Sequence, residues 1–383
     1  QPRTPTDEPQ IQPDSISSSP MINVNLGPSA TPCPDSIEVE GAPLGIACMR
    51  LAVSEERAFE LVVDRFSQDD ITQAILNQRY DYPPGFTLLR ELAPDPGRVV
   101  DLGAYTGPFA CYAAALGHTV LAVEASRHNV ALIGATLARD QSLAVNVIHA
   151  ALSDQAGTIE FVQAGPYGVV ANPSVIAPTI QVGAATVDAL LAEMGWTGVD
   201  FLKLDIEGSE VKAVRGMAGL LSRPDAPTVF YESNYYTLAM FGETPQSLMR
   251  ALEGFGYQCY LIDGSWLRPA RSGEFQPATN VDYLAIKRPL PALKSWQPGP
   301  PLAMNEIAER VAATSSDPHP LVRLCMARAL ADAGPAILAQ ARVQQALLAL
   351  QQDPDVRVRE AAAWWQSRSV NPLRRWWWAL RGK

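Results

Sequence analysis

The segment at residues 99–124 constrains the fold of this chain more than any other, because its pattern is that of a strand, a glycine turn, a helix and a second strand. The first apolar run ends in Asp101, and a turn with Gly103 and Gly107 follows. After a helical stretch, a second apolar run ends in Glu124. This arrangement is typical of the nucleotide-binding half of a doubly wound α/β sheet.

The residue types in this turn indicate what it could bind. Gly103 and Gly107 lack a Cβ, so the backbone can come close to a ligand. Glu124 follows the first glycine by about 20 residues, where a carboxylate accepts hydrogen bonds from ribose hydroxyls. The third glycine of G-x-G-x-x-G is absent, and Asp101 would repel a pyrophosphate but attract a cation. S-adenosylmethionine (SAM) carries an ammonium, a sulfonium and a ribose, so it suits these acids better than NAD; a turn without any ligand is the alternative.

Strand and helix patterns alternate from residue 98 onward. Predicted strands cover 98–102, 119–123, 145–149, 199–204 and 228–231, and the runs 258–262 and 281–286 form a predicted antiparallel pair. Polar or acidic groups lie at the ends of five strands, at Asp101, Glu124, Ser153–Asp154, Asp205 and Glu232. Because ligands of open α/β sheets bind beyond the carboxyl ends of the strands, we expect these groups to meet at one rim.

Composition limits the partners and the compartment. The formal charge of −10 argues against a nucleic-acid partner, which would require a basic surface. The five cysteines are scattered and include no C-x-x-C pair, which predicts buried free thiols in a reducing, cytoplasmic compartment and no zinc site. A spanning helix and a signal peptide are not expected either, because no apolar run has the required length or flanks.

The 383 residues divide into five predicted segments. A flexible tail at 1–35, rich in Pro and Ser, precedes an extension at 36–97 that is either a lid beside the ligand site or a cover for a sheet edge. Ser54 is predicted to begin a helix within this extension. The α/β core follows at 98–288, then a proline-rich linker at 289–301 and a helical module at 302–383.

The helical module contains a short internal repeat. Asp317-Pro-x-x-x-Val-Arg323 recurs as Asp353-Pro-x-x-x-Val-Arg359, 36 residues later. The aspartate is expected to cap a helix that the proline opens, with the valine packed inward. The pattern resembles HEAT-type repeats, which predicts either a protein partner or a packing role. The basic, tryptophan-rich tail at 374–383 suits weak contact with a membrane surface, or a cap on the module.

A more specific motif lies at Phe201–Glu210, which reads F-L-K-L-D-I-E-G-S-E. It resembles the K-x-D-x-E-G-x-E segment of the FkbM-type methyltransferases. Asp101–Gly107 resembles their D-x-G-A-N-x-G loop, with Tyr105 in place of the usual Asn. The segments at 123–125 and 150–154 match the ends of the second and third strands of the family. The resemblance covers residues 40–288.

This resemblance implies a class I methyltransferase fold, a doubly wound sheet with an antiparallel last strand, that uses SAM to methylate hydroxyls of sugars, glycans or polyketide-like products. Asp101, Gly103 and Gly107 would hold the methionine end, Glu124 the ribose, and Ser153 and Asp154 the adenine. Asp205 and Glu207 would lie beside the methyl group. The full set of implied cofactor contacts is Asp101, Gly103, Ala104, Tyr105, Gly107, Glu124, Ala125, Ser153, Asp154 and Asp205.

A hydroxyl acceptor must lose a proton, and carboxylates are the best placed candidates to take it. We expect Glu207 or Glu232 to be the general base and Asp205 to orient the acceptor, although Asp205 could simply cap the next helix. We predict no metal site. The alternative is that these acids hold Mg²⁺, which would acidify the acceptor hydroxyl. Two other functions stay open, an NAD-linked sugar enzyme and a non-catalytic scaffold that acts through the helical repeats.

Overall fold

The computed structural model describes residues 27–28, 33–54, 57–164, 167–172, 177–273 and 280–370, with side chains described except at 27–28 and 364–370. Most of the predicted flexible tail at 1–35 and the whole tryptophan-rich tail at 374–383 lie outside these ranges. Among the described residues, none of the helices is both long enough and apolar enough to cross a membrane.

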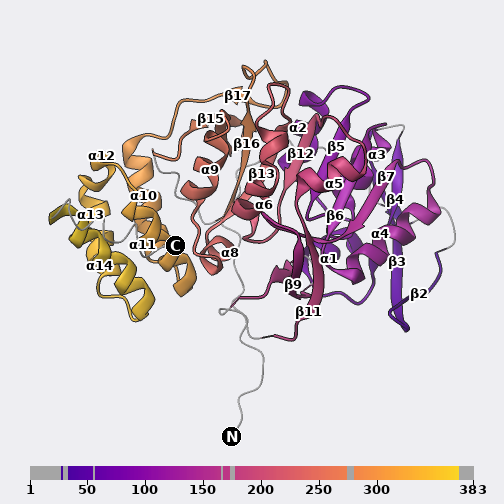
Figure 1. The fold of residues 1–383 in the computed structure, drawn as a ribbon, viewed down its shortest axis with the longest axis horizontal. Helices are drawn as coiled ribbons and strands as arrows, with labels where there is room; N and C mark the ends of the chain where they lie inside the picture. The colour runs from indigo at the N-terminus through magenta and orange to yellow at the C-terminus, as the bar shows by residue number, and fades with distance from the viewer. Residues whose placement is uncertain are drawn as a thin grey trace, which may run out of the picture.

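Within the described part of the chain, the central sheet has nine strands in the order β17-β15-β14-β16-β13-β12-β5-β6-β7 (Figure 1). The strands from β13 to β7 are parallel, and β16 pairs antiparallel with both β13 and β14. The bounds are β5 Arg98–Leu102, β6 Thr119–Glu124, β7 Val145–His149, β12 Phe201–Leu204, β13 Thr228–Asn234, β14 Gln258–Asp263, β15 Trp266–Ala270, β16 Asn280–Ile286 and β17 Gln297–Pro298. The predicted doubly wound sheet with an antiparallel last strand is thus confirmed.

Helices cover both faces of this sheet, because alternate residues of each strand face opposite sides. Val99 packs into one core with helices α2 and α3, while Val100 packs into the other with α5, α6 and α9. The helix bounds are α2 Pro84–Leu92, α3 Pro108–Ala115, α4 Arg127–Arg139, α5 Val187–Glu193, α6 Glu210–Gly216, α7 Ala218–Leu221, α8 Tyr235–Met240 and α9 Pro245–Glu253. Both faces of β5 are therefore buried, as the adjacent apolar residues Val99 and Val100, which face opposite sides, predict.

The N-terminal extension forms a separate antiparallel sheet. Its strands are β1 Gly27–Pro28, β2 Ser36–Val39, β3 Ala42–Ala52 and β4 Ala58–Asp64, followed by α1 Asp70–Leu76. The helix predicted after Ser54 is wrong, because residues 58–64 pair with β3 as a strand. β4 packs on the helices α3 and α4, where the Val62 N–H donates to Thr136 Oγ1 at 2.9 Å. The strand β4 of the extension thus covers α3 and α4. Residues of α1, Asp70 and Ile71, line the cavity described below.

The cysteines differ from the prediction of five free thiols. Cys33 and Cys48 form a disulfide, because β2 and β3 pair in antiparallel register and bring residues 15 apart to a Cα–Cα distance of 5.7 Å. Cys111, Cys259 and Cys325 are free and buried, as predicted. Disulfides persist in oxidising compartments, so this bond argues against the predicted reducing compartment. The cytoplasmic location stays a prediction.

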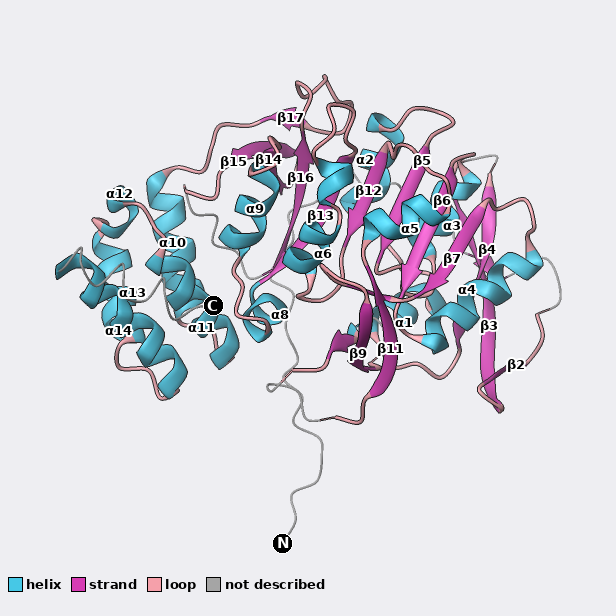
Figure 2. Ribbon diagram, in the orientation of Figure 1, coloured by secondary structure: helices cyan, strands magenta, loops and turns pink. Residues whose placement is uncertain are grey.

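A smaller sheet stands beside the carboxyl ends of the central strands (Figure 2). It has the order β10-β9-β11-β8, with bounds β8 Ala151–Leu152, β9 Gly157–Val162, β10 Val169–Val170 and β11 Ile180–Ala185. β11 pairs parallel with β8, which follows directly on β7, so this sheet is tied to the end of the central sheet. It places Phe161 and the residues around 167–170 next to the ends of β5 and β6.

The helical module lies at the end of the molecule opposite the N-terminal sheet of β2, β3 and β4 (Figure 2). Its helices are α10 Met304–Ser315, α11 Pro320–Ala331, α12 Pro335–Leu338, α13 Ala341–Leu350 and α14 Val356–Val370. In this module α10 packs on α13 and α11 packs on α14. The module also packs on the core: α11 contacts α8, and Arg328 Nη1 donates to the Ala239 carbonyl at 3.1 Å.

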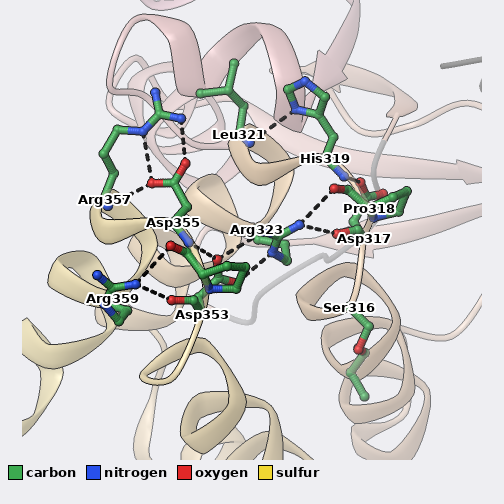
Figure 3. Close-up of polar contacts among 12 residues, drawn as sticks. Ser316, Asp317, Pro318, His319, Leu321, Arg323, Asp353, Asp355, Arg357 and Arg359 are labelled. Carbon is green, nitrogen blue, oxygen red and sulfur yellow. Dashed lines mark hydrogen bonds and ion pairs between the residues drawn. The ribbon is translucent and has the colours of Figure 1, made fainter. Parts of the chain in front are cut away.

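One aspartate–arginine pair, Asp353 with Arg323, links the two repeats (Figure 3). Arg323 donates to both carboxylate oxygens of Asp353 at 2.6 and 3.0 Å and to the carbonyl of Asp317 at 2.7 Å. The predicted aspartate caps are wrong: His319 is the cap of α11, and the Asp317 carboxylate holds the turn before it by accepting from the His319 N–H. The repeated valines are buried, as predicted.

Replacing Arg323 with Met is expected to lower the free energy of unfolding by about 3 kcal/mol, because the Asp353 side chain, only 5% exposed, loses the partner of its charge. Chemical denaturation measures the change. Arg359→Met is the matched control, since Arg359 Nη1 donates only to the carbonyls of Asp353 and Pro354. Equal losses for the two variants would contradict a stabilising role of the charge pair.

Candidate active site

A cavity of about 320 Å³ opens at the carboxyl ends of β5, β6, β12 and β13. It lies where the strand order reverses between β5 and β12, which is where open α/β sheets bind their ligands. Its walls include the glycine turn after β5, the acid at the end of β6 and the acidic turn after β12. The predicted convergence of strand-end acids is confirmed for Asp101, Glu124, Asp205 and Glu232, all of which line it.

Close contact between two turns makes this convergence possible. Gly103 has a φ of +81°, and a Cβ on it would lie 1.8 Å from the carbonyl oxygen of Asp205. The Asp205 N–H in turn donates to the Leu102 carbonyl at 3.1 Å. Glycine is therefore required at 103 both for its backbone conformation and for the approach of the turn after β12.

Lys203 joins the acids of these two turns. Its Nζ lies 3.5 Å from Asp101 Oδ1 and 3.0 Å from Asp205 Oδ2, and it donates to the Gly103 carbonyl at 3.1 Å. Burial opposes the charge of Lys203, but Asp205 and Asp101 together raise the pKa of its ammonium. Asp101 is fully buried, and neither of its carboxylate oxygens has a hydrogen-bond partner among the described residues. Burial raises the pKa of Asp101 to about 6, although Lys203 lowers it.

Glu124 is fixed by the backbone at the end of β6. Its Oε2 accepts from the Tyr105 N–H and its Oε1 from the Ser126 N–H, both at 2.8 Å. Burial raises the pKa of Glu124 to about 7, although these N–H groups lower it. The carboxylate is therefore held in one orientation in the cavity wall, with little cost of ordering when a ligand binds.

Tyr105 has a backbone φ of +51°, which explains why Asn, a residue that tolerates this conformation, suits the position. In this chain the tyrosine hydroxyl donates to Asp69 at 2.8 Å and also contacts Thr72 Oγ1. Both partners lie at the start of α1. Tyr105, which stands where the family usually has Asn, thus attaches the glycine turn to the N-terminal extension. Asp70 and Ile71 of this extension line the cavity as well.

The turn after β12 holds the predicted catalytic acids. Glu207 has a φ of +55°, a conformation that costs free energy for a residue other than glycine. Gly208 follows with a φ of +100°, and a Cβ on it would lie 2.4 Å from the Thr237 carbonyl of α8. Glu210 Oε1 holds the turn by accepting from the N–H groups of Ile206 at 3.1 Å and Gly208 at 3.0 Å. Such strain is typical of functional sites.

Several acids gather at this end of the cavity. Burial, Asp205 and Glu210 raise the pKa of Glu207 well above its ordinary value. Burial, Asp205 and Asp282 do the same for Glu232, which lies directly opposite Asp282 in the β13–β16 register. No group of three or more His, Cys, Asp or Glu side chains among the described residues is arranged to hold a metal ion.

Some predicted residues do not reach the cavity. Ala104, Tyr105 and Ala125 line it, but Gly107, Ser153 and Asp154 do not. Gly107 is instead the N-cap of α3, with a φ of +91°. Ala150, Ala151 and Leu152, just before the predicted pair, form the wall at that point, so the adenine contacts of Ser153 and Asp154 stay predictions.

Sequence reasoning did not assign roles to several polar residues of the wall. Lys203 was visible only as the first letter of the K-x-D motif. The others lie in connecting segments or at the ends of strands, where no periodic signal identifies them: Tyr80, Tyr167, Ser209, Asn234 and Asn280. Tyr167 contacts Asp70 through its hydroxyl, so the loop after β9 is linked to the start of α1 across the cavity.

The strand order, the glycine turn and the acidic rim define a class I methyltransferase fold with its site at the switch point. Residues 101–259 match the family model described as the methyltransferase FkbM domain, so this segment belongs to that family and the resemblance seen in the sequence is confirmed. A search of curated proteins finds no match.

The solved structures that match this chain include several methyltransferases. A precorrin-6y C5,15-methyltransferase from Geobacter metallireducens is 12% identical, with a TM-score of 0.30 over 50% of this chain and 80% of its own. The WbdD structure is 17% identical, with a TM-score of 0.30 over 50% of this chain and 36% of its own. A tRNA (uracil-54, C5)-methyltransferase from Pyrococcus abyssi is 13% identical, with a TM-score of 0.32 over 62% of this chain and 43% of its own.

Proposed function

We propose that the protein is a SAM-dependent O-methyltransferase that acts on a hydroxyl of a sugar, glycan or polyketide-like acceptor. The observation that carries the proposal is Asp101, a fully buried carboxylate in the cavity wall that accepts no hydrogen bond among the described residues and shares the Lys203 ammonium, 3.5 Å away, with Asp205. A buried acid of this kind is costly unless a charged or donating ligand completes it. The ammonium of SAM is such a ligand, and the ribose hydroxyls fit Glu124.

The residues of the cavity divide into two proposed groups. Asp101, Gly103 and Glu124 bind the cofactor, which when bound supplies a methyl group on a positively charged sulfur. Asp205 orients the acceptor hydroxyl, and Glu207 takes its proton. The raised pKa of Glu207 suits this role, because it makes this carboxylate a stronger base than an ordinary glutamate. Holding the acceptor oxygen in line with the methyl group supplies much of the remaining rate.

Two measurements test this function. Isothermal titration calorimetry with SAM and with NAD should give heat with SAM alone, and S-adenosylhomocysteine should form when a hydroxylated acceptor is present. Heat with NAD but not with SAM would favour the NAD-linked alternative. SAM binding without product across a broad acceptor panel would favour a scaffold that acts through the helical module.

SAM binding is expected to weaken on acidification. The pKa of Glu124 is raised to about 7 and that of Asp101 to about 6, so both acids protonate in the free protein as the pH falls from 8 to 5. The Kd should rise about tenfold per pH unit below 7, and more steeply below 6. Acidification should have the opposite effect on the unliganded protein. Burial of the two charged carboxylates destabilises the fold, so the free energy of unfolding should rise as they protonate. Calorimetry at several pH values measures the trend, and a Kd independent of pH would contradict it.

A further inference from the structure

The end of the cavity beyond Asp205 is built from polar side chains. Glu207, Ser209, Glu232, Asn234 and Asn280 line it, and they come from the turn after β12 and from the paired strands β13 and β16. Amides and hydroxyls both donate and accept hydrogen bonds, while carboxylates accept them. This part of the wall can therefore bind several hydroxyl groups at once.

Positive charge is scarce here. Lys203 is the only basic side chain among the described residues that line the cavity. Its ammonium already contacts Asp101, Asp205 and the Gly103 carbonyl, so it has little capacity left to bind an anion. The surrounding carboxylates would repel a phosphate or a second carboxylate, and no basic group would offset that repulsion.

Ser209 is the one buried hydroxyl of this wall that has no role in the fold. It is 3% exposed and is the N-cap residue of α6, yet its side chain makes no capping hydrogen bond. Glu210 accepts instead from the N–H groups of the preceding turn. The Ser209 Oγ has no hydrogen-bond partner among the described residues. A buried hydroxyl without a partner is unfavourable, which indicates that a ligand supplies one.

We propose that the acceptor is a polyhydroxyl ring without negative charge, such as a neutral sugar unit, and that Ser209 Oγ hydrogen-bonds one of its hydroxyls. The proposal rests on the proposed methyltransferase function and names the substrate class of the same site. Selectivity comes from repulsion as well as attraction, because the carboxylates reject phosphorylated and uronic-acid forms of a ring whose neutral form fits.

Matched glycosides test the charge selectivity. Neutral methyl pyranosides of several configurations, their 6-carboxylate and 6-phosphate forms and a 2-amino form are compared for binding to the protein loaded with S-adenosylhomocysteine, by saturation-transfer NMR, and for methylation with SAM. Neutral rings should bind, and at least one should be methylated, with the anionic partners at least tenfold weaker. Equal or tighter binding of an anionic partner, or binding of no neutral ring, would overturn the proposal.

Two serine variants test the residue. Ser209→Ala should raise the KM of the neutral acceptor about fivefold to tenfold, the effect of one lost hydrogen bond, with the SAM Kd and the Tm unchanged. Ser233→Ala is the matched control: Ser233 is also buried with an unpartnered Oγ, but it does not line the cavity. It should leave the KM unchanged. An unchanged KM in Ser209→Ala overturns the assignment.

These measurements separate the two levels of the proposal. If SAM does not bind by calorimetry, the methyltransferase function fails and the acceptor class fails with it. If SAM binds and an anionic ring is methylated at least as well as its neutral partner, only the acceptor class fails.

Discussion

Replacing Glu207 with Gln is expected to lower the kcat of methyl transfer by about 10²–10⁴-fold, the range typical of a lost general base. The glutamine keeps the size of the side chain and the positive φ at 207, but it cannot take a proton. Because burial, Asp205 and Glu210 raise the pKa of Glu207, the wild-type kcat should increase with pH as this acid ionises. Steady-state kinetics with SAM over a pH series measures both effects, and the variant should lose the dependence on pH.

Glu232→Gln is the matched control for this prediction. Glu232 also lines the cavity and also has a raised pKa, but it lies on a regular strand opposite Asp282 rather than in the strained turn. We expect the smaller loss in Glu232→Gln, with the SAM Kd of both variants within a few fold of wild type. A larger loss in Glu232→Gln would identify Glu232 as the base instead.

Glu124→Ala is expected to weaken SAM binding by 10²-fold or more. Each hydrogen bond to a charged group contributes about 1.5–3 kcal/mol, and the carboxylate at this position can accept from both ribose hydroxyls. The variant also leaves the N–H groups of Tyr105 and Ser126 without their acceptor, so the glycine turn loses its order. Calorimetry at pH 8, above the pKa of about 7 of Glu124, gives the largest difference from wild type.

Asp154→Ala is the control for the cofactor site. Asp154 is also an acid that follows a strand of the core, but it does not line the cavity. We expect a much smaller rise in the SAM Kd for this variant than for Glu124→Ala. Equal losses in Asp154→Ala and Glu124→Ala would contradict the position of the ribose at Glu124 and would support the adenine contact predicted from the sequence.

The parts of the fold that could be predicted from the sequence are those set by local pattern. Apolar runs and glycine turns identified the five parallel strands, because strands buried on both faces leave a continuous signal. The strand β4 was predicted as a helix, since the polar residues after Ser54 resemble a helix start, whereas pairing with β3 decides its conformation. The Cys33–Cys48 bond depends on the same pairing and was also missed.

The candidate site shows the same division between local and long-range information. The acids at Asp101, Glu124, Asp205 and Glu232 could be predicted to meet, because parallel strands present their carboxyl ends at one edge. The contacts of Lys203 could not, since they depend on the register of β5 and β12. The unused hydroxyl of Ser209 has no sequence signal at all, because a serine before a helix ordinarily caps it.

The apolar side chains of α10, α11, α13 and α14 belong to the same buried cluster as one face of the central sheet. The helical module consequently packs as part of the core rather than being joined to it only by the linker. A chain shortened to end at residue 301 would leave α8 without its cover from α11, and α8 is the helix against which the Gly208 turn is pressed. The turn that holds Asp205 and Glu207 is thus supported from outside the methyltransferase domain, by the C-terminal helices.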